Sequence, residues 1–585
     1  MKRIIFTLFI ILSSLALNAQ SIYTIGSDGD YATWSAFNTA INPSAGDAIL
    51  FRRGETFRED CDVDFSGTGA NPIRIGSYGT GANPKIYGST ALSNWTIDAG
   101  NRYVSATSVS SPRSNDYYGA LFAILNDSIY HFDIEEDNVA AVDADGEWTY
   151  NAGSIYFYWS GGDPDDEFDS FEIAQRGFCF SMDGDNPEEW LIFDSLTVRF
   201  SIQAGISSGY PGNGGVEGMI YRHDTIGYIG IKGSGFAYGI EDYHANSLVE
   251  NCFFSDCGRR AISYNGYVDQ DPGEAIIFTN IIIRDNIFRR GYHTTALDLS
   301  VQQSNTDTVD GVYFYRNIID DSDLPPFTEN WTSNQVFTQS GGVNTRMFNM
   351  YFYANVFIYA TARNILPEGG NSVYIWNNTI YGHNPNLGVG QAPFANVSSG
   401  GTDSISYINN ILYDNIDGLD NYGLGTWEDT PYYIARDYNL YYQDNPDAAN
   451  DQAFFLYNTD SYDITDWATY RTNYSAFDGN SPTPAIPQWT DKDNFDLTLT
   501  EESPCNGAGT DLPSVMITDP LGNTEDMTAL DVNGVLYNNP PSLGAYEYDG
   551  VAPPQPSTPS VYNVKRVKLG GYRRKSNGSF INIGK

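Results

Sequence analysis

Basic residues are scarce in this chain. Its 585 residues include 31 lysines and arginines against 73 aspartates and glutamates, a net charge of −42. Two of the basic residues lie in the first 19 positions and seven in the last 25, and neither stretch holds an acid, so residues 20–560 carry 31 − 2 − 7 = 22 basic residues and a net charge of 22 − 73 = −51. Such a body repels nucleic acid and anionic surfaces. We therefore expect no nucleic-acid partner, and an anionic ligand would need a local cluster of basic side chains.

Cysteine is rare as well, with five residues that are spread along the chain. An odd number of cysteines in a chain long enough to bury a large core does not indicate a disulfide framework. Cys252 and Cys257 are close in sequence; they either pair in an oxidising compartment or, the interpretation that we favour, are two small buried side chains. The cysteines and the five histidines show no spacing typical of a metal site.

Long hydrophobic runs are missing after the N-terminus. Lys2 and Arg3 precede the apolar run IIFTLFIILSSLAL, and LNA before Gln20 is a cleavage site of small residues. The run has about 14 residues, fewer than a membrane span needs. We predict a signal peptide over residues 1–19 that is cleaved near Ala19, a secreted or cell-surface protein, and no membrane span in the mature chain. A retained anchor is the alternative.

Helical stretches rich in Ala, Glu, Lys and Leu are also missing. Gly (57), Tyr (43) and Phe (32) are abundant, and short β-branched or aromatic runs alternate with clusters of Gly, Asn, Asp and Ser. This pattern is typical of an all-β protein with many turns.

An asparagine recurs inside these apolar runs, although asparagine is depleted in ordinary strands. The motifs are VENCFF, IRDNIF, FYRNII, YFYANVF, IWNNTI, YINNIL and RDYNLY, with the marker residues Asn251, Asn286, Asn317, Asn355, Asn378, Asn410 and Asn439. Successive spacings are 35, 31, 38, 23, 32 and 29 residues, and Asp224 and Ser195 continue the series 27 and then 29 residues earlier. About nine such repeats predict a solenoid.

The repeat favours a parallel β-helix. Its pieces are too short and too β-branched for helical repeats, and the Trp-Asp signature of propeller blades is absent. We predict about three short strands per coil and about ten or more coils over most of residues 45–510, with the apolar side chains of each strand pointing inward. The markers would stand at the bend between two strands, in a left-handed or bridge conformation, and hydrogen-bond in a ladder from coil to coil.

Both ends of a solenoid need covers. Tyr31, Trp34, Phe37 and Ile41 fall on one face of a helix over residues 31–41, which predicts an N-terminal cap, and we expect residues 503–547 to cover the other end. The expected organisation is a signal peptide (1–19), a cap with the first coils and an inserted β module (20–185), a central β-helix (186–500), a closing coil (501–549), a Pro-rich linker (550–560) and a basic tail (561–585).

Several stretches resemble the secreted right-handed parallel β-helix proteins of the pectate-lyase-like superfamily. Residues 44–89, in which GTGANP occurs at 67–72 and again at 79–84, resemble the opening coils of these proteins. Residues 143–166 resemble the module that precedes the helix in many carbohydrate-active members, and ESPCNGAGTD with SLGAYEYD resembles their closing coil. The resemblance covers roughly residues 20–550 and implies the fold, but this fold hosts lyases, hydrolases, epimerases, tailspikes and adhesins.

The resemblance directs attention to basic residues. A lyase acting on uronates needs a group that neutralises the carboxylate, a base for the C5 proton and a proton donor for the leaving oxygen. In this fold the base is often Lys or Arg, or His with Tyr. Between residues 20 and 560 there are three lysines, of which only Lys232 falls in the central coils, where arginines and three of the five histidines also gather.

Strand register suggests a constellation among these residues. Ile231, Ile262 and Leu297 can share one inward position, so that Lys232, Ser263 and Asp298 stack outward. Arg260 and Thr295 then stand at the strand entrance, with His293 just before. We predict catalytic roles for Lys232, Arg260, His293 and Asp298, and substrate contacts from Tyr264, Tyr292 and Arg290. The alternative is that these arginines and histidines only pair with neighbouring acids.

A calcium cofactor is a second hypothesis. SMDGDNPEEW (181–190) and DPDDEFD (163–169) concentrate oxygen ligands, but neither has the spacing of a defined calcium loop. Acidic solvated turns are the interpretation that we favour, and the metal, if any, is not identified by the sequence.

Two classes of function follow. The first is an exported polysaccharide-active enzyme, with a lyase of uronate-containing, acidic polysaccharide favoured. The second is a non-catalytic surface or fibre protein of the same fold that binds glycan or spaces other modules.

The C-terminal end of the chain has its own composition. Residues 549–560 are typical of an extended Pro- and Ser-rich linker. The basic tail 561–585 predicts a contact with an anionic cell-envelope surface or another subunit. A disordered tail lying on the acidic body is the alternative.

Overall fold

The computed structural model describes residues 20–548, residue 550 and two short strands, β50 (Tyr572–Arg574) and β51 (Phe580–Asn582). Gaps in this description fall at 115–116, 133–134, 183–187, 210–215, 231–235, 266–276, 302–307, 323–333, 341–345, 361–362, 368–371, 384–393, 398–403, 414–423, 428–432, 444–454, 458–459, 463 and 549. The predicted signal peptide, Lys232 and most of the linker and tail therefore lie outside the described residues.

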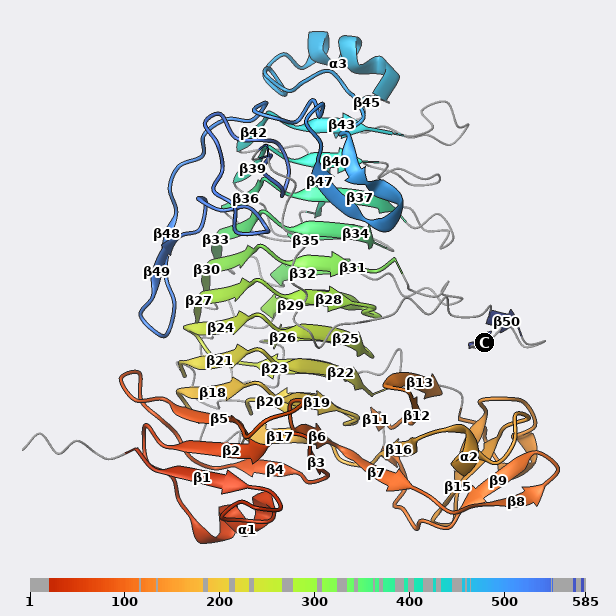
Figure 1. Ribbon diagram of the computed structural model, residues 1–585. Coiled ribbons are helices and arrows are strands. Elements are labelled where there is room, and N and C mark those ends of the chain that lie inside the picture. Colours follow the sequence, from red (N-terminus) through yellow and green to blue (C-terminus); the bar gives the residue numbers. More distant parts are fainter. Residues whose placement is uncertain are drawn as a thin grey trace, which may run out of the picture.

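Three long sheets form the body of the molecule (Figure 1). In the described chain, sheet A has twelve strands: β1 (Ile22–Ile25), β2 (Ala48–Arg52), β5 (Ile73–Tyr78), β18 (Leu191–Asp194), β21 (Met219–Arg222), β24 (Ser247–Glu250), β27 (Ile277–Arg284), β30 (Thr308–Tyr315), β33 (Arg346–Tyr353), β36 (Val373–Trp376), β39 (Ser404–Ile408) and β42 (Tyr433–Asp437). Sheet B has eleven described strands: β3 (Thr56–Phe57), β6 (Lys85–Tyr87), β19 (Thr197–Arg199), β22 (Thr225–Ile229), β25 (Phe253–Cys257), β28 (Ile287–Arg289), β31 (Ile318–Asp320), β34 (Val356–Ala360), β37 (Thr379–His383), β40 (Ile411–Tyr413) and β43 (Leu440–Tyr442). Sheet C has twelve described strands: β4 (Cys61–Val63), β17 (Phe178–Met182), β20 (Ala204–Ser207), β23 (Tyr238–Asp242), β26 (Arg260–Asn265), β29 (Thr294–Val301), β32 (Asn334–Ser340), β35 (Arg363–Pro367), β38 (Phe394–Val397), β41 (Leu424–Trp427), β44 (Phe455–Tyr457) and β45 (Asp460–Tyr462).

The chain visits the sheets in the order A, B, C and then returns to A. Strands β18, β19 and β20 form one such coil, and β21, β22 and β23 form the next, paired in parallel with the first. This is the predicted right-handed parallel β-helix. Its strands run from Ile22 to Tyr462, so the helix begins and ends earlier than the expected span of 45–510. The two GTGANP copies end one residue before β5 and β6, which are successive strands of one coil.

One apolar core fills the interior of the coils. Each strand contributes alternate side chains to it, so that one inward column in sheet A runs through Phe193, Tyr221 and Val249, and all three are 0% exposed. Sheet C supplies Ile206, Ile240, Ile262, Leu297 and Val336 in the same way. The five cysteines are buried and free, so the favoured interpretation of Cys252 and Cys257 agrees with the structure.

The predicted asparagine ladder stands at the bend between sheets A and B. It consists of Asn286, Asn317, Asn355, Asn378, Asn410 and Asn439, which are at most 1% exposed. In each step the side-chain Oδ1 accepts the backbone N–H and the side-chain Nδ2–H of the asparagine one coil before, as Asn317 does from Asn286 at 3.0 Å for both bonds. The same Nδ2 group of Asn286 also donates to the carbonyl of Val249. These bonds satisfy buried amides that would otherwise cost about 1–3 kcal/mol each.

The left-handed conformation that was one of two predicted for the markers is not that of the ladder residues. The left-handed residue is the one that precedes the ladder, as at Asp285 (φ 59°) and Asn377 (φ 53°). Asn251 (φ 53°) and Ser195 (φ 64°) are themselves such bend residues, so their assignment to the ladder was wrong by one position. Cys252 and Leu196 occupy the ladder there, and their backbone N–H groups donate to Asn286 and Asp224. An asparagine is favourable at either position, because it tolerates the left-handed conformation and also bridges coils.

An inserted module interrupts the second coil between sheets B and C. Residues 89–174 form two antiparallel four-stranded sheets, one of β7 (Ser89–Leu92), β12 (Leu121–Leu125), β13 (Ser128–Phe132) and β16 (Ser170–Ala174), the other of β8 (Trp95–Ala99), β9 (Arg102–Ser105), β14 (Trp148–Asn151) and β15 (Ser154–Tyr158). The module has its own core, which includes Trp95, Trp148 and Phe157, and projects to one side of the helix in Figure 1. It packs against the coils through Phe122, which contacts Phe200 of the bend after β19.

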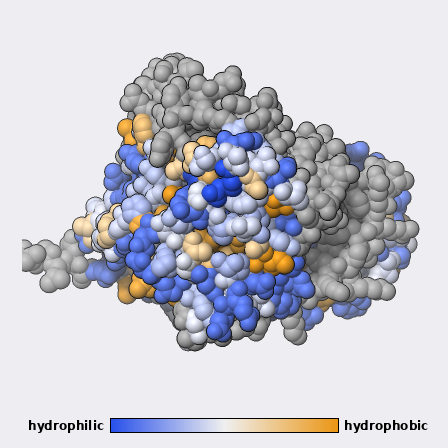
Figure 2. Space-filling view, turned by 90° about the horizontal axis from the view of Figure 1, so that it is seen from above, coloured by the Kyte–Doolittle hydropathy of each residue, from blue (hydrophilic) through white to orange (hydrophobic). Residues whose placement is uncertain are grey.

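Short helices cover both ends of the core. At the N-terminal end, α1 (Trp34–Ala40) is capped by Thr33 and buries Trp34 and Phe37, as predicted. At the other end, η2 (Ile464–Asp466) and α3 (Trp467–Asn473) lie over the last coil, with Tyr470 buried and Trp467 packed on Tyr441. Viewed onto this end in Figure 2, the described surface is largely hydrophilic with separated hydrophobic spots. The expectation that residues 503–547 cover this end was therefore wrong.

The chain after α3 instead runs back along the outside of the coils (Figure 1). The hairpin β46 (Trp489–Asp491) and β47 (Asp496–Leu499) packs on the outer face of sheet B. Residues 512–528, here called the C-terminal strap, contain β48 (Met516–Thr518) and β49 (Thr524–Asp526) and cross the outer face of sheet A. Apolar side chains of the strap form one cluster with an outward column of sheet A, Ile192, Ile220, Leu248 and Ile282, of which each member is at most 6% exposed.

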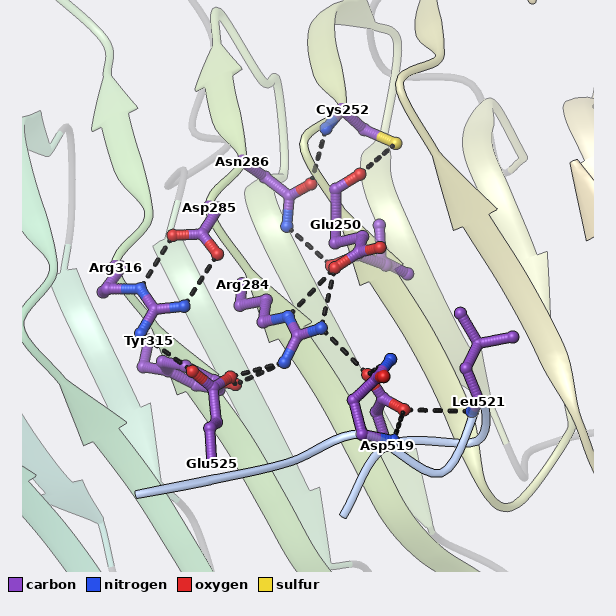
Figure 3. Close-up of polar contacts among 12 residues, drawn as sticks. Glu250, Cys252, Arg284, Asp285, Asn286, Tyr315, Arg316, Asp519, Leu521 and Glu525 are labelled. Carbon is purple, nitrogen blue, oxygen red and sulfur yellow. Dashed lines mark hydrogen bonds and ion pairs between the residues drawn. The ribbon is translucent and has the colours of Figure 1, made fainter. Parts of the chain in front are cut away.

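Charged side chains fix the strap to sheet A (Figure 3). Arg284 forms ion pairs with Glu250 of the sheet at 2.8 Å and with Asp519 of the strap at 3.0 Å, and it also pairs with Glu525. Tyr315 donates to Glu525 at 2.5 Å, and Arg316 lies 3.3 Å from the same carboxylate.

In the part of the chain that the structure describes, no helix is long and apolar enough to cross a membrane.

Candidate functional site

Sheet C differs from the other two sheets on its outer face. The strap packs on part of sheet A, and the β46–β47 hairpin and the inserted module pack on parts of sheet B. The outward positions of β20, β23, β26 and β29 carry polar and charged side chains, and no apolar cluster of the described residues packs on them. This polar face is the candidate site.

Strand register brings four of its side chains into one outward column. Ser207, Glu241, Ser263 and Asp298 occupy equivalent positions of β20, β23, β26 and β29. The prediction that Ser263 and Asp298 stack outward, with Ile262 and Leu297 inward, is confirmed. The strand that pairs with β26 on its other side is β23, and it contributes Ile240 and Glu241 rather than Ile231 and Lys232. The register proposed for Lys232 was therefore wrong. The location of Lys232 lies outside the described residues.

Asp298 is the centre of a buried hydrogen-bond network. Its side chain is 0% exposed, and the Arg260 guanidinium lies 2.7 Å from its Oδ2 atom. The hydroxyls of Ser300 and Thr294 donate to the carboxylate at 2.7 and 3.3 Å. Arg260 also donates to Ser263 at 3.1 Å and lies over the ring of Tyr238. A carboxylate enclosed in this way is stable only because its cation and hydroxyl partners satisfy it.

His293 stands at the rim of this network with its side chain 26% exposed. Its Nδ1 atom lies 3.1 Å from the Thr294 hydroxyl and 3.9 Å from Asp298. Burial, followed by the positive charge of Arg260, lowers the pKa of His293 from 6.5 to about 4. The imidazole is therefore neutral at pH 7 and can accept a proton.

Glu241 is a second carboxyl group on the same face, and it is partly exposed. It accepts hydrogen bonds from Ser207 at 2.9 Å and from Tyr243 at 3.0 Å. Burial raises its pKa despite these hydrogen bonds and the charge of Arg260, so Glu241 keeps its proton to a higher pH than an ordinary glutamate. A carboxylic acid of this kind can donate a proton.

Arg259 brings a second guanidinium to the rim. Burial, followed by repulsion from Arg260, lowers its pKa, so an anionic group placed here would stabilise it. Phe236 is 38% exposed and meets the buried ring of Tyr238 edge-on, with the ring centroids 6.0 Å apart. An exposed aromatic ring beside charged groups is suited to contact the apolar face of a sugar.

Three residues that the sequence suggested for substrate contact are placed elsewhere. Tyr264 points into the core, is 0% exposed and shares a hydrogen bond of 2.7 Å with Ser247, so its expected outward position was wrong. Tyr292 is 5% exposed and is therefore not presented for stacking. Arg290 forms a bidentate pair with Asp256, with Nη2 2.6 Å from Oδ2. The structure thus brings together Arg260, His293 and Asp298 and does not bring these three residues to them.

The alternative of simple charge pairing holds for many central arginines. Arg222, Arg284, Arg289, Arg290 and Arg316 each form ion pairs with acids of neighbouring coils or of the strap. Arg260 is also paired, with Asp298, but it alone among these six lies on sheet C, where His293 and Glu241 stand beside it. Position on sheet C, rather than charge alone, therefore distinguishes the candidate site.

The acidic stretches considered for calcium serve other purposes where they are described. Asp163 caps the short helix α2 (Pro164–Glu167), and Asp165 accepts the backbone N–H of Trp95. Within the described ranges, no group of three His, Cys, Asp or Glu side chains is arranged to hold a metal ion. Residues 183–187 of the second stretch lie outside those ranges.

Sequence reasoning missed Glu241, Thr294 and the prominence of Arg259. Glu241 follows Ile240 in YGIED, a strand-like pattern that could have been aligned with Ser263 and Asp298 in place of IGIKG. Thr294 was passed over in favour of Thr295, which donates instead to Asp321 at 2.7 Å. The register of β29 against β32 shifts between Thr294 and Leu297. The alternation of apolar and polar residues in the sequence does not reveal such an irregularity.

Comparison with solved structures identifies proteins of the same fold. XylC in complex with xylose is 12% identical, and the match covers 90% of this chain and 98% of that one with a TM-score of 0.53. Pectate lyase Pel9A (13% identical, 91% and 98% covered, TM-score 0.38) and an alginate lyase from Paenibacillus sp. str. FPU-7 (11% identical, 71% and 98% covered, TM-score 0.31) are more distant. At these identities the likeness extends to the fold alone. No protein-family model matches the sequence, and no curated protein matches it.

Proposed function

We propose that this protein is an exported enzyme that cleaves uronate-containing polysaccharide by β-elimination on the outer face of sheet C. The observation that carries the proposal is His293, an imidazole whose pKa is lowered to about 4 and which stands beside Arg259 and Arg260. A neutral base next to guanidinium groups suits the removal of a proton adjacent to a carboxylate, because the cations stabilise the charge that develops on that group.

Each step of this reaction has a candidate residue. Arg259 would bind the uronate carboxylate, because an anion there relieves the burial and repulsion that lower its pKa. His293 would take the C5 proton. Glu241, whose pKa is raised by burial, would donate a proton to the leaving oxygen. Arg260 and Asp298 would hold this arrangement rather than react, since they occupy one another.

A glycan ligand is supported by two further observations. Phe236 is exposed beside the charged groups, where a sugar ring could stack. XylC, whose fold this chain shares, is described with bound xylose; this is an analogy at the level of fold. Because the strongly acidic body repels an acidic polysaccharide, binding would depend on the local cations Arg259 and Arg260.

The test is an assay of the mature protein on a panel of uronate polysaccharides, with ultraviolet absorbance as the measure of unsaturated products. His293→Asn should lower kcat by roughly 10²- to 10⁴-fold, the usual contribution of a general base. The acid limb of kcat/KM should lie near pH 4, the pKa of His293, rather than near its ordinary value. Saturated products would contradict β-elimination and indicate hydrolysis.

Glycan binding without catalysis is the second candidate. It is favoured by the complete pairing of Asp298 with Arg260, Ser300 and Thr294, which is what a purely structural network would look like. This function predicts that the panel yields binding without any product, and that His293→Asn leaves the affinity unchanged.

Export is part of the proposal and rests on residues 1–19. We expect secretion or display at the cell surface with an N-terminus at Gln20, which N-terminal sequencing of the exported protein would establish. The basic tail 561–585 is proposed to contact an anionic cell-envelope polymer or another subunit.

A further inference from the structure

Thr294 links the two residues at the heart of the candidate site. It is the first residue of β29 and is 0% exposed. Its hydroxyl oxygen lies 3.1 Å from Nδ1 of His293 and 3.3 Å from Oδ2 of Asp298. A hydroxyl carries one proton to donate and has lone pairs to accept, so it can serve both neighbours only in a defined direction.

The chemistry of Asp298 sets that direction. Asp298 is the ion-pair partner of Arg260 at 2.7 Å and accepts the Ser300 hydroxyl proton at 2.7 Å, so it acts as a carboxylate, which can only accept. The single proton of the Thr294 hydroxyl is therefore given to Asp298. The hydroxyl oxygen must then accept a proton from His293, which requires that the proton of the imidazole is on Nδ1.

We infer that Thr294 is a positioning residue that holds neutral His293 in the tautomer protonated on Nδ1, which leaves the lone pair on Nε2. The catalytic consequence rests on the proposed function, whereas the tautomer itself does not. In the proposed reaction Nε2 takes the C5 proton, and the imidazolium that forms keeps its Nδ1–H bond to Thr294.

The backbone supports this assignment. The N–H groups of His293 and Thr294 both donate to the carbonyl of Arg259, at 3.1 and 2.9 Å. Among the described residues, the charged groups near the imidazole are Arg260, Asp298 and Arg259, and the two cations disfavour a second proton on the ring. The ring is therefore held as a neutral base with its orientation fixed by neighbouring strands β26 and β29.

Two substitutions separate the hydroxyl from the shape of the side chain. Thr294→Val keeps the volume and removes the hydroxyl, whereas Thr294→Ser keeps the hydroxyl. The tautomer is read from the ring-nitrogen NMR signals of the full-length protein labelled with ¹⁵N-histidine. The chain has five histidines, and the signal that disappears in His293→Asn is that of His293. At pH 7 the wild type and Thr294→Ser should show the Nδ1–H tautomer. Thr294→Val should shift His293 toward the Nε2–H form.

Kinetics provide the second readout. Thr294→Val should lower kcat by roughly 10- to 100-fold, as the loss of an orienting partner usually does, with KM unchanged, and Thr294→Ser should restore most of it. An Nε2–H tautomer in the wild type would overturn the inference, and so would a Thr294→Val variant whose tautomer is unaltered. The wild-type measurement decides the point even if Thr294→Val fails to fold. A protein that turns over no glycan but shows the expected tautomers would defeat the proposed function and leave the inference standing.

Discussion

The outer faces of sheets A and C are built on the same coils, but the outward side chains of sheet A are apolar and those of sheet C are polar. On sheet A, an outward column of Ile192, Ile220, Leu248 and Ile282 is apolar and belongs to the cluster that the C-terminal strap completes. On sheet C, the equivalent outward positions of the same coils hold Ser207, Glu241, Ser263 and Asp298, which are satisfied by one another and by Arg260.

The difference shows that each face of a β-helix can be specialised without changing the core. Outward side chains do not contact the interior, so they are free to vary once the inward column is apolar. An apolar outer column then needs a cover to keep it from water, whereas a polar one needs internal partners. The polar face, on which no apolar cluster of the described residues packs, is the one that we propose for a ligand.

Removing the strap should have the largest effect. A chain ending at Glu502 exposes the apolar column of sheet A and takes away Cys505, Leu543 and Ala545 from the cluster on sheet B. Exposure of each large aliphatic side chain costs about 1.5–3 kcal/mol, and the whole domain is stable by only about 5–15 kcal/mol. We expect loss of soluble folded protein, measured by yield and by circular dichroism. A truncated chain that melts as the full chain does would show that the strap is not needed as a cover.

Single ionic substitutions on the two faces should differ in size. Arg260→Met leaves the enclosed carboxylate of Asp298 without its cation and should cost about 3–5 kcal/mol of unfolding free energy. Glu525→Gln keeps the shape of the strap contact, and its partners Arg284 and Arg316 have other acids, so about 1 kcal/mol is expected. Denaturant unfolding of both variants measures the two values. Adding Asp298→Leu to Arg260→Met should recover part of the loss, and equal losses on the two faces would contradict the comparison.

One carboxyl group on each face should respond oppositely to pH. Although burial acts to raise it, the hydrogen bond from Tyr315 and the charges of Arg316 and Arg284 lower the pKa of Glu525, so its stabilisation is present above the unfolded pKa and lost as pH falls through the folded one. Burial raises the pKa of Glu241, so its contribution is present at acid pH and lost as pH rises through the folded pKa.

Melting temperatures across the acid range measure these slopes. Glu525→Gln should flatten the fall of stability on the acid side, and Glu241→Gln should flatten the fall that accompanies rising pH. His293→Asn is a third comparison: because its pKa is lowered to about 4, the stabilisation from neutral His293 is present above pH 6.5 and lost as pH falls through 4. Parallel slopes in Glu525→Gln and Glu241→Gln would show that the two carboxyl groups do not differ in this way.

Removal of the basic tail should have the smallest effect on the fold. The described β-helix, both end covers and the strap are complete before residue 550, so a chain ending at Ser560 should melt at the same temperature as the full chain. If the tail contacts an anionic surface, the same truncation should reduce cell association. Unchanged association and secretion would defeat that proposal.

Much of the fold could be predicted because its signal is repeated. A ladder of asparagines at 23–38-residue spacing requires that equivalent residues stack, and Asn286, Asn317 and Asn355 do so. The N-terminal cap was predictable from local periodicity, since Trp34 and Phe37 are one helical turn apart. The one-position errors at Asn251 and Ser195 arose because adjacent residues at a bend favour the same amino acid for different reasons.

The candidate site was predictable only in part. Within one strand, alternation identified Asp298 as outward and Leu297 as inward. Between strands, the coils differ in length, so the sequence could not decide that Glu241 rather than Lys232 lies beside Ser263. Tyr264 was misplaced although the same alternation puts it on the inward side with Ile262, where its hydroxyl meets that of Ser247 in the core.

The sequence by itself determined that this chain is a stacked solenoid, because a repeated apolar and asparagine pattern can be satisfied only by burying each coil against the next. The tertiary structure alone decided where the C-terminal segment lies and which polar residues meet on sheet C. Contacts such as Arg284 with Glu525, or Arg260 with Asp298, join residues of different coils or of the strap, and their partners are set by strand register and by the path of the chain in space. Neither of these is encoded in a local pattern.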